Sequence, residues 1–389
     1  MLDQQRVRDD TPGCLDKVFL DSAGSSLPPR PVLDAMVSHL RREAEIGGYR
    51  AAAERADDLA AVKSSVAELL GAQPEDVALV ESATRAWADF FYAVPLSAGD
   101  RILVTEVEYA SNAIAALQRA RVTGATVEVV PSTPTGELDL EALHRMLDER
   151  VRVVSVVHAP TNGGLLNPVR EVVDLAHAVG SLVLLDACQS IGQVAVDVAD
   201  LGVDALSATG RKWLRGPRGT GLLYLRPELA RTMEPAALDL HGAQWAEEHG
   251  YRLAPDASRF EFWECSVASR LGLGAAVRYL LDLGIDEIEQ AVSARAEYAR
   301  TELAAVPGVT VRDLGGQRSG IVSFTVDGVD PNVVRVSLAD KDVTVTVSGR
   351  GSTFLDMTRR KLDGVVRASP HYFNSFEDVD RLVAAVAAR

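Results

Sequence analysis

The sequence predicts an α/β fold in which a large domain with a mostly parallel seven-stranded sheet precedes a smaller α+β domain. Two observations carry this prediction. Short runs rich in Val, Ile and Leu alternate with amphipathic segments over the first two thirds of the 389 residues, as in consecutive βα units. After about Pro227 the alternation stops. We therefore expect the large domain at residues 16–258 and the small domain at 259–389, with residues 1–15 joining the latter.

Seven strands are expected in the large domain because each is a short apolar run of the kind that fills a buried parallel sheet. They are placed at 76–80, 101–105, 126–130, 151–157, 182–185, 205–207 and 221–225. The segment from Pro168 to Gly180 shows the helices expected between them. Its apolar residues recur at helical spacing, with Pro at the start and Gly just past the end. Such alternation covers both faces of one sheet with helices.

The small domain is predicted from a different order of elements. One long helical run covers 267–306, and an amphipathic helix closes the chain at 375–388. Between them, short strands are expected at 309–312, 321–326 and 343–347.

Composition limits the kinds of partner. Asp and Glu (55) outnumber Lys and Arg (40), which gives a formal net charge of −15. Nucleic acids and anionic membranes need a concentrated cationic face, so neither is expected as a partner. No apolar run is long enough for a membrane span and the first residues lack a signal-peptide core, so a cytoplasmic location is expected. Cys14, Cys188 and Cys265 are widely spaced, which predicts neither disulfides nor a zinc site.

Ligands of open α/β sheets bind at the carboxyl ends of the strands, so residues that follow predicted strands are the first candidates. Asp186 follows the run 182–185, and a carboxylate at the end of a buried strand needs a cation or hydrogen-bond donors. A helix N-cap is the alternative interpretation. The segment ESATRAW (81–87) opens a helix after a strand and offers free amides and hydroxyls to an anion. Simple capping is the alternative there.

A basic, glycine-rich segment, SATGRKWLRGPRGTG (207–221), follows a later strand. It gathers Arg211, Lys212, Arg215 and Arg218 in an otherwise acidic chain, which fits an anionic ligand such as phosphate. A solvated loop is the alternative. A lysine, a carboxylate on a neighbouring strand end and a phosphate-type helix start together indicate pyridoxal phosphate. That cofactor needs an amine for a Schiff base, an acid for its ring nitrogen and a cradle for its phosphate.

At these residues the sequence resembles the class V aminotransferase family, whose fold-type I superfamily includes cysteine desulfurases and isopenicillin N epimerase-like proteins. The resemblance runs from VFLDSAGSSLP near the start to VVRASPHYFNSFEDVDRLV near the end. Within the family, REAEIGGY, GRKWLRGPRGTG and VRASPH are most similar to hercynylcysteine sulfoxide lyases. The resemblance implies a fold-type I architecture, an amino-acid substrate and a homodimer.

The resemblance also implies roles for single residues around the cofactor ring. Lys212 corresponds to the Schiff-base lysine, and Asp186 to the partner of the pyridine nitrogen. Gln189 corresponds to the donor to the ring hydroxyl. Tyr109 stands where desulfurases stack a histidine on the ring, a task that a phenol ring can perform.

Phosphate and substrate contacts are implied in the same way. Thr209 and Arg211 correspond to phosphate ligands, and the helix start at Ala83 and Thr84 completes the cradle. Arg367 corresponds to the arginine that binds the substrate α-carboxylate, which suits a bidentate guanidinium.

Three departures from the family pattern bear on the reaction. The loop VSGRGSTFLDMTRR has no cysteine where desulfurases carry their nucleophile, so persulfide-forming desulfuration is not expected. Thr161 replaces an expected asparagine, with Asn162 beside it, and the choice between them stays open. Glu264 falls where a partner-chain threonine contacts phosphate, and Arg218 is a possible substitute. Cys188 is expected to point away from the cofactor as a small core residue.

We therefore expect a carbon–sulfur β-lyase that acts on an S-substituted cysteine and releases a thiol or sulfenate, pyruvate and ammonia. One alternative is an aminotransferase, or an enzyme that couples decarboxylation to oxidative deamination of a thiol-conjugated cysteine in lincosamide-type natural-product assembly. A non-catalytic binding protein that retains the fold is another. The sequence leaves the group on sulfur open.

Overall fold

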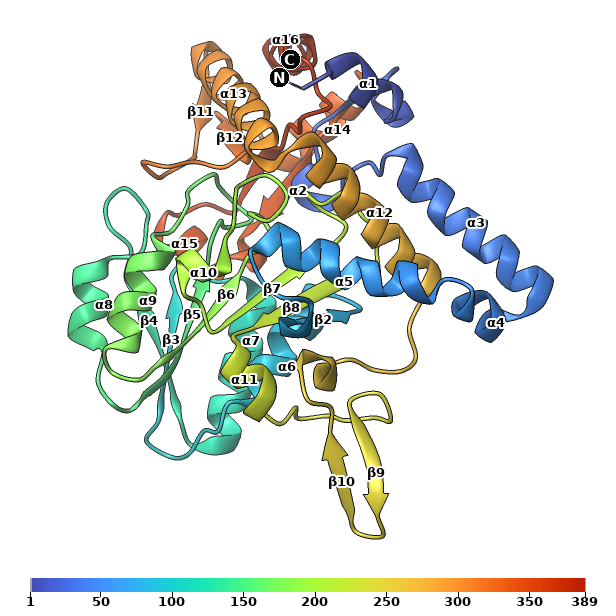
Figure 1. Ribbon diagram of the computed structural model, residues 1–389. Helices are drawn as coiled ribbons and strands as arrows, with labels where there is room; N and C mark the ends of the chain where they lie inside the picture. Colours follow the sequence, from blue (N-terminus) through green and yellow to red (C-terminus); the bar gives the residue numbers. More distant parts are fainter. Residues whose placement is uncertain (1, 389) are drawn as a thin grey trace.

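The computed structural model describes residues 2–388, and a seven-stranded sheet forms its centre (Figure 1). The strand order is β2-β8-β7-β6-β5-β3-β4. Strand β8 runs antiparallel to β2 and β7, and the other neighbours are parallel. The strands are β2 (Val77–Val80), β3 (Arg101–Thr105), β4 (Thr126–Val130), β5 (Val151–Val157), β6 (Leu182–Asp186), β7 (Ala205–Thr209) and β8 (Gly221–Leu225). The predicted mostly parallel α/β sheet is confirmed.

Two apolar cores cover the two faces of this sheet, because successive strand residues point to opposite sides. In β6, Val183 and Leu185 belong to one core and Leu184 belongs to the other. The first core includes residues of α5 (Ala56–Leu70), α8 (Leu140–Met146), α9 (Val169–His177), α10 (Val198–Leu201) and α12 (Val267–Leu283). The second includes α6 (Ala83–Ala93), α7 (Ala110–Thr123) and α11 (Pro227–Thr232). Helices therefore cover both faces, as the sequence predicts.

A second, four-stranded antiparallel sheet with the order β11-β12-β15-β14 lies in the C-terminal part. Its strands are β11 (Val309–Val311), β12 (Val322–Val326), β15 (Gly364–Ala368) and β14 (Thr346–Gly349). Residues of α13 (Ile285–Ala305), α14 (Pro331–Ala339) and α16 (Phe376–Ala387) share a third core with this sheet. The helix α15 (Phe354–Arg359) lies between β14 and β15.

Three details of this part differ from the sequence prediction. The expected helical run 267–306 is two helices, because Gly284 has φ +85° and ends α12. The expected strand 343–347 is likewise divided into β13 (Val343–Thr344) and β14. Strand β15 was not expected at all, and it is the strand that carries Arg367.

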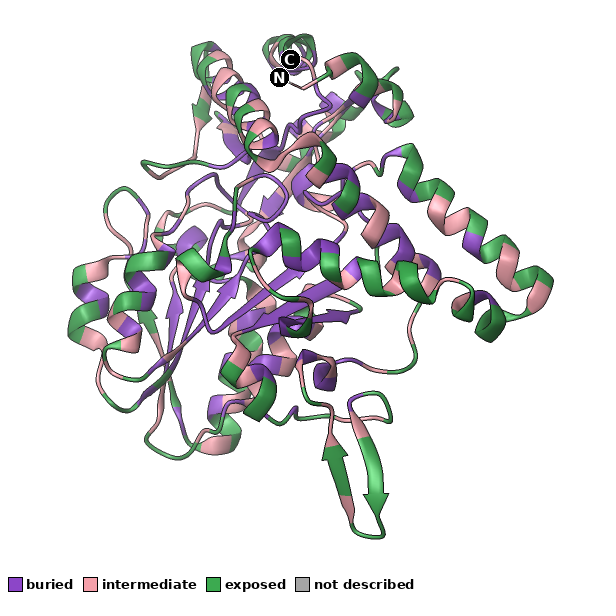
Figure 2. Cartoon of the chain, viewed as in Figure 1, coloured by how far each residue is buried: buried purple, intermediate pink, exposed green. Residues whose placement is uncertain are grey.

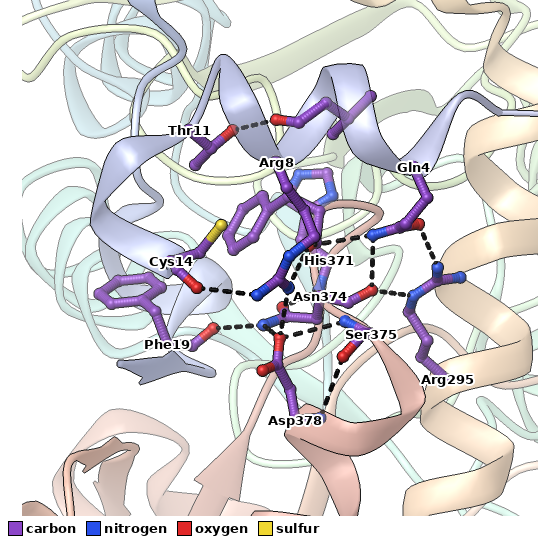
Figure 3. A network of polar contacts seen from close by, with 12 residues as sticks. Gln4, Arg8, Thr11, Cys14, Phe19, Arg295, His371, Asn374, Ser375 and Asp378 are labelled. Atoms are coloured by element: carbon purple, nitrogen blue, oxygen red, sulfur yellow. Dashed lines mark hydrogen bonds and ion pairs between the residues drawn. The ribbon is translucent and has the colours of Figure 1, made fainter. Parts of the chain in front are cut away.

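The N-terminal segment packs against the C-terminal part. Strand β1 (Val18–Phe19) pairs in parallel with β13. Figure 3 shows α1 (Gln4–Asp9) in the polar network above the start of α16. Arg8 Nη1 lies 2.9 Å from Asp378 Oδ2, and Gln4 Nε2 donates to the carbonyls of Phe373 and Asn374. Helix α12 contacts α5 and α3 (Arg30–Ile46) instead. The division of the chain after residue 258 stays a prediction.

One hairpin and one helical arm stand away from the body of the molecule (Figure 1). The hairpin comprises β9 (Ala243–Glu247) and β10 (Gly250–Leu253), and the arm comprises α3 and α4 (Gly48–Ala53). Much of their surface is exposed, in contrast to the buried central sheet (Figure 2). A short helix, α2 (Ser22–Ser25), follows β1. Across residues 2–388, none of the helices combines the length and apolar character needed to cross a membrane.

Candidate active site

A pocket of about 90 Å³ opens where β5, β6 and β7 end. It is lined by strand-end and helix-start residues: Ser82, Ala83, Thr84, Tyr109, Val157, Ala159, Thr161, Asp186, Cys188, Gln189, Thr209, Arg211 and Lys212. Every residue for which the sequence implies a cofactor contact is in this set. Arg367 adjoins the pocket, because its guanidinium Nη1 donates to the Thr161 hydroxyl at 2.7 Å.

Asp186 is the last residue of β6, and its carboxylate lies in the pocket wall. Oδ1 accepts from the backbone amide of Cys188 and Oδ2 accepts from Asn112 Nδ2, both at 2.9 Å. No helix begins at Asp186, so the helix-cap alternative is wrong. Two donors hold the buried carboxylate in one orientation toward the pocket.

Lys212 lies in the turn after β7 and lines the same pocket. Burial lowers the pKa of its amine, and the thiol of Cys188 and the carboxylate of Asp186 oppose that effect. An amine with a lowered pKa has a larger unprotonated fraction at neutral pH, which a nucleophile or a base requires.

An anion cradle surrounds the start of α6. The Ser82 hydroxyl caps this helix by accepting from the Arg85 amide at 3.2 Å, and the amides of the first turn have no helical partner. Gly221 allows the close approach of β8, because a Cβ there would lie 2.5 Å from the Ser82 carbonyl carbon. The capping interpretation is therefore confirmed, and anion binding at this helix start stays a prediction.

Thr209 and Arg211 line the same pocket as the start of α6. The Thr209 hydroxyl donates to the carbonyl of Thr220 at 3.3 Å. Arg211 is anchored by a hydrogen bond from Nη1 to the Gly24 carbonyl, so α2 positions one cation at the pocket.

Gln189 connects the pocket to Trp213 and to the carbonyl of Ala23. Its Oε1 accepts from Trp213 Nε1 at 2.9 Å, while Nε2 donates to the Ala23 carbonyl at 3.0 Å. The same Nε2 lies 3.4 Å from the Thr161 hydroxyl, which is a long hydrogen bond. The amide therefore keeps one weakly engaged donor that faces the pocket.

Arg367 comes from the centre of the small sheet and is only 5% exposed. Nη2 forms an ion pair with Asp21 Oδ1 at 3.1 Å, and Nη1 contacts Thr161. Its Nε is buried and has no partner among the described residues. Burial lowers the pKa of this guanidinium and the Asp21 carboxylate opposes the shift. A buried donor without a partner fits an incoming carboxylate.

The open choice between Thr161 and Asn162 is resolved by position. Thr161 lines the pocket, whereas Asn162 is buried and donates to Asp356 Oδ2 at 2.7 Å. Arg218 and Glu264 are both exposed and lie outside the pocket lining. Their roles at phosphate stay predictions.

Two expectations are wrong. Cys188 does not point away, because the turn that closes on Asp186 brings it into the pocket wall. The second concerns the basic segment 207–221, in which not every cation faces the pocket. Arg215, at φ 60°, is turned inward, where Nε donates to the Leu27 carbonyl and Nη2 to the Thr11 hydroxyl. It holds the N-terminal segment instead.

Several site residues escaped the sequence analysis. Asp21 partners Arg367, and Glu108 and Asn112 stand behind Asp186. The position of Glu108, just past a strand end in TEVEYASN, was a usable signal. The pairing of Asp21 with Arg367 had none, since 346 positions separate them.

These residues fit pyridoxal phosphate on structural grounds. A buried amine at Lys212, a carboxylate at Asp186 and an anion cradle at α6 face one cavity. The unpartnered Nε of Arg367 lies beside it and supplies a place for a substrate carboxylate.

Comparison with known proteins agrees with this geometry. The class V aminotransferase family model matches residues 18–382. A probable cysteine desulfurase of Methanothermobacter thermautotrophicus is 30% identical over 97% of this chain and 95% of its own length. The apo cysteine desulfurase structure from Thermococcus onnurineus NA1 has a TM-score of 0.92 at 26% identity, with 100% of this chain and 98% of its own covered. The predicted fold-type I architecture is confirmed.

Proposed function

Because this chain belongs to the class V aminotransferase family and is a pyridoxal-phosphate-dependent enzyme, we propose that it cleaves the carbon–sulfur bond of an S-substituted cysteine. The reaction is a β-elimination in which the Cα–H and Cβ–S bonds break. The sulfur leaves with its substituent as a thiol or sulfenate. Water then converts the remaining three-carbon fragment into pyruvate and ammonia.

The observation that carries this proposal is the lack of a thiol suited to accept sulfur. The loop between β14 and β15 contains no cysteine. Cys14 is buried in the first core described above. Burial raises the pKa of the Cys265 thiol. Burial and the Asp186 charge raise the pKa of Cys188, so its thiol stays protonated. A protonated thiol is a poor nucleophile, and the sulfur therefore leaves with its substituent.

Five side chains and the start of α6 would hold the cofactor. Asp186 would face the ring nitrogen, Tyr109 would lie against the ring, and Thr209, Arg211 and the α6 start would hold the phosphate. Lys212 would supply the amine for the covalent link. When bound, the cofactor supplies an electron sink for the charge that develops at Cα.

The substrate is positioned by Arg367 and deprotonated by Lys212 in this proposal. Arg367 binds the α-carboxylate through Nε and through Nη2, which Asp21 must first release. This contact fixes the Cα–H bond relative to the pocket. The amine of Lys212, with its lowered pKa, accepts the Cα proton.

A product-resolved mass-spectrometric screen of cofactor-loaded protein with S-alkyl and S-aryl cysteines and their sulfoxides tests the proposal. We expect equimolar pyruvate, ammonia and sulfur product from at least one substrate, lost in Lys212→Ala and retained in the exposed control Lys17→Ala. A 2-oxo acid that keeps its sulfur, without pyruvate, would indicate transamination. Oxygen uptake with carbon dioxide release would indicate oxidative deamination. Either result contradicts the proposal.

We also infer that the protein is a homodimer. Large apolar side chains are exposed on the helical arm and the hairpin, with Tyr49 at 80% and Trp245 at 82%. The Tyr49 ring meets the ring of Trp263, itself exposed, at a centroid distance of 5.7 Å. Exposed apolar clusters of this kind favour contact with another chain. Light scattering of the purified protein tests the inference, and a fully active monomer would contradict it.

A further inference from the structure

A buried carboxyl group, Glu108, lies directly behind the pocket, and the proposed reaction does not use it. It is 3% exposed. Oε1 accepts from the amide of Tyr109 and from Asn112 Nδ2, both at 2.9 Å, and Oε2 accepts from Ser155 Oγ at 2.8 Å. Within residues 2–388, no Lys, Arg or His side chain forms an ion pair with it.

Asn112 joins Glu108 to Asp186. The two hydrogens of its Nδ2 go to Glu108 Oε1 and Asp186 Oδ2, each at 2.9 Å. One amide group on α7 thus holds two carboxyl groups from different elements. Since the Glu108 carboxyl also accepts from the backbone of Tyr109, it is connected to two pocket residues at once.

Ionising both neighbouring carboxyl groups costs free energy, because within residues 2–388 no cation forms an ion pair with Glu108 to offset a second charge. Burial raises the pKa of Glu108 to about 8, and the charge of Asp186 adds to the shift. The hydrogen bonds from Asn112 and Ser155 oppose it. At neutral pH Glu108 therefore carries a proton.

We propose that Glu108 is a positioning residue that holds Asp186 and Tyr109 in place through Asn112 and the Tyr109 amide, and that its ionisation adds a negative charge behind Asp186. The proposal rests on the proposed function, in which Asp186 faces the ring nitrogen of the cofactor. The groups that face Glu108 are Tyr109 and Asn112 on its own segment, Ser155 from β5 and Asp186 from β6. Among them only Asp186 carries a carboxyl group.

The ionisation of Glu108 makes the stability of the apoprotein depend on pH. The pKa of Glu108 is about 8 in the folded protein, against an ordinary value of 4.5. The folded state therefore binds more protons than the unfolded state between these values, so stability falls as pH rises from about 4.5 to about 8 and levels off above that. A neutral residue at this position removes that contribution.

Glu108→Gln is the test variant because its side chain is the shape of the protonated carboxyl. Its Oε1 accepts from Tyr109 and Asn112, and its Nε2 donates to Ser155 Oγ. Glu106→Gln is the matched control on the same segment, since Glu106 pairs with Arg359 at 2.8 Å and not with Asp186. Thermal unfolding of the apoproteins between about pH 6 and 9 is the first measurement. We expect wild type and Glu106→Gln to lose stability more steeply than Glu108→Gln. Equal slopes would overturn the proposal.

A second variant, Ser155→Ala, keeps Glu108 but removes a donor that stabilises its ionised form. We expect the pH range in which Ser155→Ala loses stability to extend to higher pH than in wild type. A shift to lower pH would contradict the role of Glu108.

Visible absorption of the cofactor-loaded proteins is the third measurement. We expect the pH titration of the bound cofactor in Glu108→Gln to differ from that of wild type by a lost or displaced alkaline step, with Glu106→Gln unchanged. Identical curves in all three proteins would overturn the proposal. A wild-type protein without a visible cofactor band would contradict the proposed function instead, and the apoprotein measurement would still decide the role of Glu108.

Discussion

The guanidinium of Arg367 is ion-paired with Asp21 across the junction of the N-terminal segment and the small sheet, with Nη2 and Oδ1 3.1 Å apart. Its buried Nε has no partner among the residues described. The Asp21 carboxylate therefore offsets the charge of Arg367, while one hydrogen-bond donor of the guanidinium, Nε, is left without an acceptor among the described residues. A substrate carboxylate that binds Arg367 must compete with Asp21 for this charge.

This competition predicts the effect of Asp21→Asn. The amide keeps the shape of the side chain but removes the competing charge, so a substrate carboxylate binds more tightly. We expect KM to fall about fivefold, equivalent to about 1 kcal/mol for a partly exposed ion pair, with kcat little changed. Steady-state kinetics with the substrate found in the product screen measures both. A raised KM would show that Asp21 supports the arginine more than it competes.

A second prediction concerns acid stability. Burial lowers the pKa of His158, after the end of β5, to about 4 from an ordinary 6.5. The unfolded state therefore binds more protons than the folded state in this window, so stability falls as pH drops from about 6.5 to 4. The full contribution is about 3 kcal/mol. We expect His158→Met to lose less stability than wild type between these values, as chemical denaturation at several pH values would show. Parallel losses would count against the assignment.

A third prediction tests the close approach behind the anion cradle. Gly221→Ala places a Cβ 2.5 Å from the Ser82 carbonyl carbon, so β8 or the start of α6 must move. We expect a stability loss of about 1–3 kcal/mol and weaker binding of pyridoxal phosphate. Gly48→Ala is the control, because a Cβ there meets nothing within 4 Å. Thermal unfolding and cofactor titration report the two effects, and a Gly221→Ala protein with wild-type cofactor affinity would disprove the account of the cradle.

The part of the site that the sequence predicted is the part built from local patterns. Asp186 and Lys212 stand in short segments at strand ends, where an apolar run and a cluster of cations are visible along the chain. The error at Arg215 has the same origin. A charge is visible in sequence, but its direction depends on a left-handed backbone angle and on contacts with Thr11 and Leu27.

The missed residues depend on contacts between distant segments. Asp21 meets Arg367 only because β1 pairs with β13 and brings the N-terminal segment to the small sheet. Glu108 meets Asp186 only through Asn112. Strand β15 is only five residues long, and its pairing with the distant strands β12 and β14 is what identifies it as a strand.

The intact mass of the protein during turnover tests the central claim most directly. Cofactor-loaded protein is mixed with an S-substituted cysteine that it consumes, and protein and small-molecule products are weighed together by mass spectrometry. We predict an unchanged protein mass, because none of Cys14, Cys188 and Cys265 accepts sulfur. Pyruvate and the sulfur product should form in equal amounts. A protein heavier by one sulfur atom, with a matching deficit of sulfur product, would contradict the claim that the sulfur leaves with its substituent.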